Sequence, residues 1–161
     1  ATPTYTLIDS TTLGSSASSV TFSSISATGK GDLVLVIDCQ GSNDTRVEGI
    51  LNSDTGTNYN YVNMQASASA AESYNDTGLN YFHAGVIRST SKSLNIVNIM
   101  DFAATDKHTS ILSKENNAAY RLFVRAIRWA NTAAVTSLAV SCAAGTFNSG
   151  STFHLYQLVS E

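Results

Sequence analysis

The stretch VTSLAVSCAAGTFNSGSTFHLYQLV, residues 135–159, contains two runs of alternating apolar and polar residues around a segment rich in Gly, Asn and Ser. The residues that share a strand face are Leu138, Val140 and Cys142 in the first run and Phe153, Leu155, Gln157 and Val159 in the second. Alternation of this kind indicates half-buried β-strands. Because turn-forming residues around Gly145 and Gly150 join the two runs, the stretch predicts a β-hairpin.

The same signals recur along the whole chain. Candidate strands cover residues 4–9, 19–25, 32–40, 46–51, 59–64, 79–87, 94–102, 109–114, 120–129, 135–142 and 152–159. Short strands separated by turn residues are typical of sandwiches and jelly rolls. We therefore expect an all-β fold, an antiparallel, jelly-roll-like β-sandwich of about ten to eleven short strands, in a single domain over residues 1–161. Residues 66–73 are expected to form two helical turns or a loop.

The composition narrows the class of protein. Charged residues make up 13% of the 161-residue chain, against roughly 25% in an average domain, and Ser and Thr are abundant. The net charge of −3 argues against a nucleic-acid-binding protein, which needs a basic surface. No apolar run is long enough for a membrane span, and no signal peptide is visible. The start at Ala1 fits loss of an initiator Met.

Two strands carry more apolar residues than one buried face requires. Residues 33–37 are apolar at every position, so Val34 and Val36 need cover from a second layer or another chain. In the strand 120–129, the second face mixes arginines with aromatic and aliphatic groups, a composition enriched at protein interfaces. The predicted partner interface comprises Arg121, Phe123, Arg125, Ile127, Trp129, Val34 and Val36. The alternative for the strand 120–129 is a loop packed over that face with the arginine stems beneath it.

Aromatic residues crowd the middle of the chain. Tyr59, Tyr61 and Tyr74 are candidate ligand-facing residues, because aromatic rings in loops stack on sugars. The alternative is that these rings pack on strand faces and in the core.

The residues that carry catalysis or bind metals form no recognisable motif. His83, His108 and His154 are isolated, and the chain contains no G-x-S-x-G or phosphate-binding loop. We therefore expect no catalytic residue, no metal site and no cofactor. The segment 52–58 has oxygen-bearing side chains at alternate positions, which suits an Asx-rich turn or, alternatively, a calcium site. Cys39 and Cys142 are expected to be reduced core thiols or, alternatively, a disulfide.

Several segments resemble a family of small β-sandwich virion proteins of tailed bacteriophages. The matching segments are residues 5–8, 11–15, 19–25, 32–37, 52–59 and 143–156. The resemblance covers both ends of the chain better than its middle. It implies a capsid decoration (cement) protein or a tail-fibre module, and it supplies no catalytic motif.

The expected function is therefore that of a non-enzymatic virion protein, made in the host cytoplasm. We expect a cement protein that assembles as a homotrimer and bridges subunits of the major capsid protein. No heptad pattern for a fibre coiled coil is present, which favours this role. The alternative is a tail-fibre or receptor-binding module that recognises a host surface polysaccharide. Neither nucleic acid nor membrane is an expected partner.

Overall fold

The computed structural model describes residues 4–26, 31–117 and 121–159, in which every regular element is a β-strand. The strands are β1 (Tyr5–Thr12), β2 (Ser19–Phe22), β3 (Gly31–Cys39), β4 (Thr45–Leu51), β5 (Tyr59–Ser67), β6 (Ala71–Leu79), β7 (Phe82–Ile87), β8 (Ser93–Ile99), β9 (Thr109–Asn117), β10 (Arg121–Trp129), β11 (Leu138–Cys142) and β12 (Thr152–Val159). Tyr120, at the start of one expected strand, lies outside the described residues. Across those same ranges, no helix exists that could cross a bilayer.

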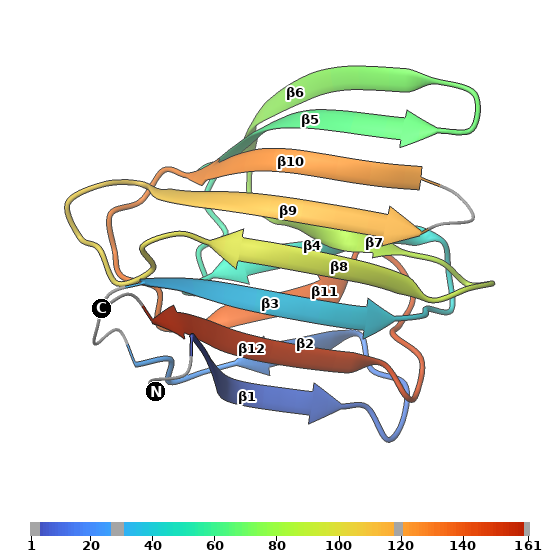
Figure 1. Ribbon diagram of the computed structural model, residues 1–161, viewed down its shortest axis with the longest axis horizontal. Coiled ribbons are helices and arrows are strands. Elements are labelled where there is room, and N and C mark those ends of the chain that lie inside the picture. Colours follow the sequence, from blue (N-terminus) through green and yellow to red (C-terminus); the bar gives the residue numbers. More distant parts are fainter. Residues whose placement is uncertain (1–3, 27–30, 118–120, 160–161) are drawn as a thin grey trace.

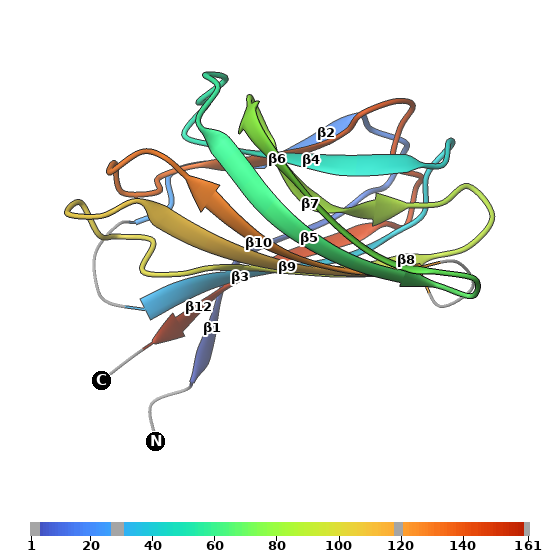
Figure 2. The same cartoon turned by 90° about the horizontal axis from the view of Figure 1, so that it is seen from above.

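The strands form two antiparallel sheets that pack face to face (Figures 1 and 2). The larger sheet has eight strands in the order β1-β12-β3-β8-β9-β10-β5-β6, and the smaller has four in the order β2-β11-β4-β7. This arrangement confirms the predicted antiparallel β-sandwich.

The strand order is that of a jelly roll with two added hairpins. The blocks β1-β12-β3-β8 and β2-β11-β4-β7 are the two four-stranded sheets of a double Greek key. The hairpin β5–β6 is inserted between β4 and β7, and the hairpin β9–β10 between β8 and β11. Both insertions join the large sheet beyond β8, so they extend it on one side only.

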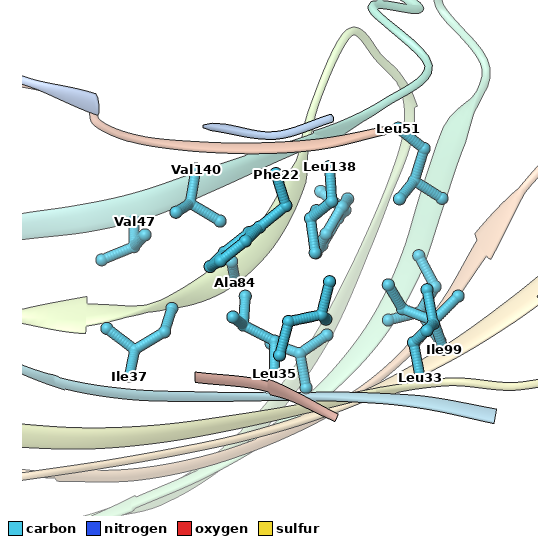
Figure 3. Close-up of a cluster of buried hydrophobic side chains, with 14 of the residues drawn as sticks. Phe22, Leu33, Leu35, Ile37, Val47, Leu51, Ala84, Ile99, Leu138 and Val140 are labelled. Atoms are coloured by element: carbon cyan, nitrogen blue, oxygen red, sulfur yellow. The ribbon is translucent and has the colours of Figure 1, made fainter. Parts of the chain in front are cut away.

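The hydrophobic core lies between the two sheets. Leu33, Leu35 and Ile37 of β3 point from the large sheet towards side chains of the small sheet such as Phe22 and Leu138 (Figure 3), and all are at most 1% exposed. Burying one such side chain stabilises the fold by roughly 1.5–3 kcal/mol. Alternation along β3 thus orients the inward residues, as period-two patterning requires.

The predicted C-terminal hairpin is wrong. Strand β11 pairs with β2 and β4 in the small sheet, whereas β12 pairs with β1 and β3 in the large sheet. The connecting residues 143–151 cross from one sheet to the other, and Phe147 within them is buried against Phe153. Alternation shows which face of a strand is apolar, but it does not identify the neighbouring strand.

Strand β6 was not predicted from the sequence. Residues 66–73 are neither helical nor a loop: they end β5, turn, and begin β6. Strand β6 lies at the edge of the large sheet, and nearly all of it is exposed. An edge strand that is exposed to solvent on both faces needs no buried apolar face. The alternation of apolar and polar residues by which a strand is recognised is therefore absent there.

Candidate functional site

The two inserted hairpins create a cleft on the inner side of the large sheet. In Figure 2, β10, β5 and β6 curve towards the layer of β4 and β7. Between them lies a cleft of about 270 Å³, here called the arginine cleft. Its lining residues are Thr45, Arg46, Gln65, Tyr74, His83, Val86, Ile87, Arg88, Arg121, Phe123 and Arg125.

The cleft forms where the inward face of β10 changes from apolar to polar. Trp129 and Ile127 lie in the core, whereas Arg125 and Arg121 lie at the cleft. The strand register places Arg125 opposite Ser113 of β9 and Asn63 of β5, and Asn63 opposite Tyr74 of β6. A row of polar side chains therefore crosses the inner face of the inserted hairpins.

A buried ion pair holds the base of this region. Arg125 is 2% exposed and Glu115 is fully buried. Arg125 Nη1 donates to Glu115 Oε1, and Ser113 Oγ donates to the same oxygen over 2.8 Å. The guanidinium also lies 4.5 Å from the ring centre of Phe123. Burial raises the pKa of Glu115, and Arg125 opposes that shift by stabilising the carboxylate.

Buried polar atoms without a hydrogen-bond partner among the described residues gather around the cleft. They include Asn63 Nδ2 and Oδ1, Gln65 Oε1, His83 Nδ1, Glu115 Oε2 and Arg125 Nε. Such atoms are rare in native proteins, and each costs about 1–3 kcal/mol when left unsatisfied. Of these residues, Gln65, His83 and Arg125 line the cleft, whereas Asn63 and Glu115 lie next to Arg125 behind it.

His83 is expected to make the fold less stable in mild acid. Burial, and then the charges of Arg125 and Arg46, lower the pKa of His83 to about 3. In the unfolded chain the pKa of this histidine is about 6.5. Below pH 6.5 the unfolded state therefore binds more protons than the folded state, and the stability of the fold decreases as the pH is lowered. Between pH 7 and pH 5 the wild-type protein should lose roughly 2 kcal/mol from this group.

Urea unfolding at the two pH values measures this loss. The variant His83→Gln should remove most of the pH dependence, whereas His108→Gln, a change at an exposed histidine, should retain it. An equal pH dependence in wild type and His83→Gln would contradict the prediction.

The three predicted ligand-facing tyrosines separate into two groups. Tyr59 is fully buried: it stacks on Trp129, and its hydroxyl accepts a hydrogen bond from the backbone N–H of Leu51. The prediction is wrong for Tyr59, because its strand position points into the core. Tyr61 is 8% exposed and meets Tyr74 edge-on at the cleft, and Tyr74 is 42% exposed. These two rings are brought together.

The partner interface predicted on β10 is wrong, because its residues lie on the buried face of the strand. Phe123, Arg125, Ile127 and Trp129 are buried in the sandwich, and Arg121, which is partly exposed, also faces inward. In the sequence, the arginines on this face argued against its burial in a core. The unseen compensating feature is Glu115 on the adjacent strand, which neutralises Arg125 within the fold.

The opposite face of the large sheet is apolar over much of its area. Two rows of cross-strand neighbours follow from the register; one runs Leu7, Tyr156, Val34, Asn98, Leu112, Ala126, Val62 and Asn75, and the other runs Ser10, His154, Val36, Ile96, Lys114, Val124, Met64 and Ser73. We call these rows, with Leu94 and Leu122 beside them, the outer apolar face. Lys114 is the one residue of this set with a fixed charge, and Asp38 and Arg128 lie beside the set on the same side of the sheet.

Large hydrophobic side chains on this face are open to solvent. Met64 is 68% exposed, Val62 60% and Leu122 50%. Two hollows lie on the face, one of about 470 Å³ beside Met64 and Leu122 and one of about 380 Å³ beside Tyr156. The predicted interface residues Val34 and Val36 line the second hollow, so their role in a partner contact stays a prediction.

The loop 52–58 forms a hydrogen-bonded turn. The carboxylate of Asp54 accepts hydrogen bonds from Trp129 Nε1 over 2.7 Å, Asn58 Nδ2 over 2.9 Å and the Gly56 N–H over 2.9 Å. Its oxygens are thus engaged by donors, which supports the Asx-turn interpretation over the calcium alternative. In the part of the chain that the structure describes, no cluster of three or more His, Cys, Asp or Glu could hold a metal.

Both cysteines are free. Burial is the main cause that raises the pKa of Cys39 and of Cys142 to about 12. The thiols are therefore protonated at neutral pH and pack as small apolar groups.

Comparisons with known proteins give little beyond the fold. No protein-family model matches the chain, and no curated protein matches it. Among solved structures, it is similar to galectin LEC-6 of Caenorhabditis elegans, with 12% sequence identity and a TM-score of 0.40 over 99% of this chain and 99% of that chain. Likeness of this degree carries no argument about function.

Proposed function

We propose that the chain is a non-enzymatic structural protein of a phage virion, which docks through its outer apolar face. The most specific form of this proposal is a capsid decoration protein that assembles as a homotrimer and bridges subunits of the major capsid protein. The observation that carries it is the exposure of Met64, Val62 and Leu122 on the outer apolar face. Contiguous apolar surface of this kind marks protein interaction sites.

Docking of this type stabilises a shell by mass action. A protein that binds only the assembled state lowers the free energy of that state in proportion to the logarithm of its concentration over Kd. The inserted hairpins matter here because β9, β10, β5 and β6 supply half of the residues of the outer apolar face, including Val124 and Met64. A jelly roll without these hairpins would present a narrower surface.

The docking prediction is tested by placing a charge at the centre of the face. Val124→Glu should weaken both self-association and binding to stripped phage particles at least tenfold, because the new carboxylate must lose its water on docking. Sedimentation velocity measures self-association, and co-sedimentation with particles measures binding. Thr21→Glu, a change at an exposed position of β2 in the other sheet, is the matched control.

Two results would contradict the proposal. One is a wild-type protein that stays monomeric and does not rebind to particles. The other is a loss of binding in Thr21→Glu equal to that in Val124→Glu. Heating particles with and without the protein adds a functional test, since the cement role requires that its removal lowers the temperature of DNA release.

A second candidate function is recognition of a host surface polysaccharide, as in a receptor-binding module. The specific observation that favours it is the arginine cleft, where Tyr74 presents an exposed ring beside unpartnered buried polar atoms. Aromatic faces and precisely placed polar groups are the usual means of holding a small polar ligand. Double-sheet jelly rolls occur in both viral capsid and lectin domains, so the fold does not decide between the two functions.

A further inference from the structure

We propose that the arginine cleft binds a carboxylate-bearing sugar residue of an acidic polysaccharide. The inference rests on the second candidate function and names its ligand class. Cationic side chains would hold the carboxylate, buried amide and imidazole groups would meet ring hydroxyls, and the Tyr74 ring would cover an apolar sugar face.

The charge of the cleft walls favours an anion. Among the described residues that line the cleft, four are arginines and none is a carboxylate. Three of these arginines have an acidic partner that is not itself a lining residue: Arg46 pairs with Glu48 over 2.6 Å, Arg88 with Asp44 over 3.0 Å, and Arg125 with Glu115. A planar guanidinium has five donors, so one carboxylate partner leaves donors for a second.

The unpartnered buried atoms favour hydroxyl groups in the same ligand. Gln65 Oε1 and His83 Nδ1 belong to lining residues, and Asn63 lies in register between Arg125 and Tyr74. Asn63 is fully buried and has both side-chain polar atoms unsatisfied. A simple inorganic anion would only accept hydrogen bonds, whereas Asn63 and Gln65 also offer acceptors that require donors.

The size of the cleft sets the length of the bound segment. Its volume of about 270 Å³ lies just below the range of roughly 300–1,000 Å³ found for drug-sized ligands. One or two sugar rings therefore suit it better than a long oligosaccharide. The half-exposed ring of Tyr74 at its edge is placed to stack on the next part of the chain.

The test compares acidic oligosaccharides with their methyl esters, in which each charged carboxylate is replaced by a neutral ester. Trigalacturonate, trimannuronate and a trimer of α2,8-linked sialic acid are titrated into the full chain and followed by NMR. At least one acid should bind at least tenfold more tightly than its ester, and added salt should weaken it. Tyr74→Ala and Arg46→Gln should each reduce binding about tenfold. Arg128→Gln, on the outward face of the same sheet, should leave it unchanged.

The outcomes separate this inference from the function on which it rests. Equal binding of acids and esters would overturn the acidic ligand and leave polysaccharide recognition standing. Absence of binding by all six compounds would overturn both. Inorganic phosphate that shifts the same resonances with equal affinity would overturn the sugar component. Thermal unfolding of each variant is measured in parallel, and the two cleft variants give independent readouts if one of them fails to fold.

Discussion

Replacement of Glu115 by alanine is expected to lower the free energy of unfolding by about 3–5 kcal/mol. The change removes the counter-charge of Arg125, which is 2% exposed and pairs with this carboxylate. An uncompensated buried charge is far more costly than a lost pair of exposed charges. The loss also removes the acceptor of the Ser113 hydroxyl. Urea denaturation followed by circular dichroism measures the change.

An exposed ion pair in the same sheet gives the matched control. Lys92 and Asp38 lie 2.9 Å apart with side chains that are 57% and 41% exposed, and Lys92→Ala should cost no more than about 1 kcal/mol. The double variant Glu115→Leu/Arg125→Met should recover most of the lost stability, because apolar groups of similar volume need no counter-charge. A loss in Glu115→Ala as small as in Lys92→Ala would contradict the buried pair.

The double variant also separates stability from recognition. It should fold, yet it lacks one of the four cleft arginines, so binding of an acidic sugar should weaken while docking through the outer apolar face persists. The two surfaces lie on opposite sides of the same inserted strands, β10 and β5. A substitution on one side therefore tests one function without direct change to the other.

The sequence predicted the sandwich because strand alternation and turn residues are local signals. It also marked Val34 and Val36 as apolar positions in excess of one buried face, and their contact with a partner stays a prediction. The one strand pairing that it predicted, the C-terminal hairpin, is wrong, since pairing depends on contacts between distant segments. The C-terminal segments show this clearly: both are strands, yet they lie in different sheets.

The sequence predicted only part of the candidate site, because the site also depends on contacts between distant strands. Tyr61, Tyr74 and the arginines of β10 were singled out, but their inward orientation depends on Glu115 and Asn63 in other strands. On β10 both faces contain apolar residues, so alternation did not decide which face is buried. Strand β9 carries polar residues on both faces from Ser113 onward, so its sequence did not show that Glu115 is buried.

The two inserted hairpins explain why both candidate functions belong to one region. The jelly-roll strands bury a core between their sheets, and Tyr59, Ile111 and Trp129 of the inserted hairpins extend it. Beyond β8, the large sheet extends with strands β9, β10, β5 and β6, which the small sheet covers only in part. Their inner face therefore borders the arginine cleft, and their outer face continues the apolar rows. Both surfaces follow from the same additions to the fold.

Trp129→Ala is expected to destabilise the protein by about 3–5 kcal/mol, as for other large buried aromatic residues. Trp129 is fully buried and its ring stacks on Tyr59, with ring centres 6.4 Å apart. The indole N–H donates to Asp54 Oδ2 over 2.7 Å and so ties the loop 52–58 to the end of β10. Because Trp129 is the one tryptophan of the chain, unfolding of the variants is followed by circular dichroism.

Trp129→Phe keeps an aromatic ring but removes the hydrogen bond to Asp54, and should cost at least about 1.5–3 kcal/mol, since the acceptor is charged and the smaller ring also leaves a cavity. Partial burial alone would raise the pKa of Asp54, but hydrogen bonds from Trp129, Asn58, Gly56 and Asn131 together lower it. A lowered pKa in the folded state stabilises the fold above the unfolded-state value of about 3.9, and this stabilisation disappears as the pH falls through the folded value. Loss of the indole donor should therefore reduce the acid dependence of stability below pH 4. Equal stability of Trp129→Phe and wild type at pH 7 would contradict the prediction.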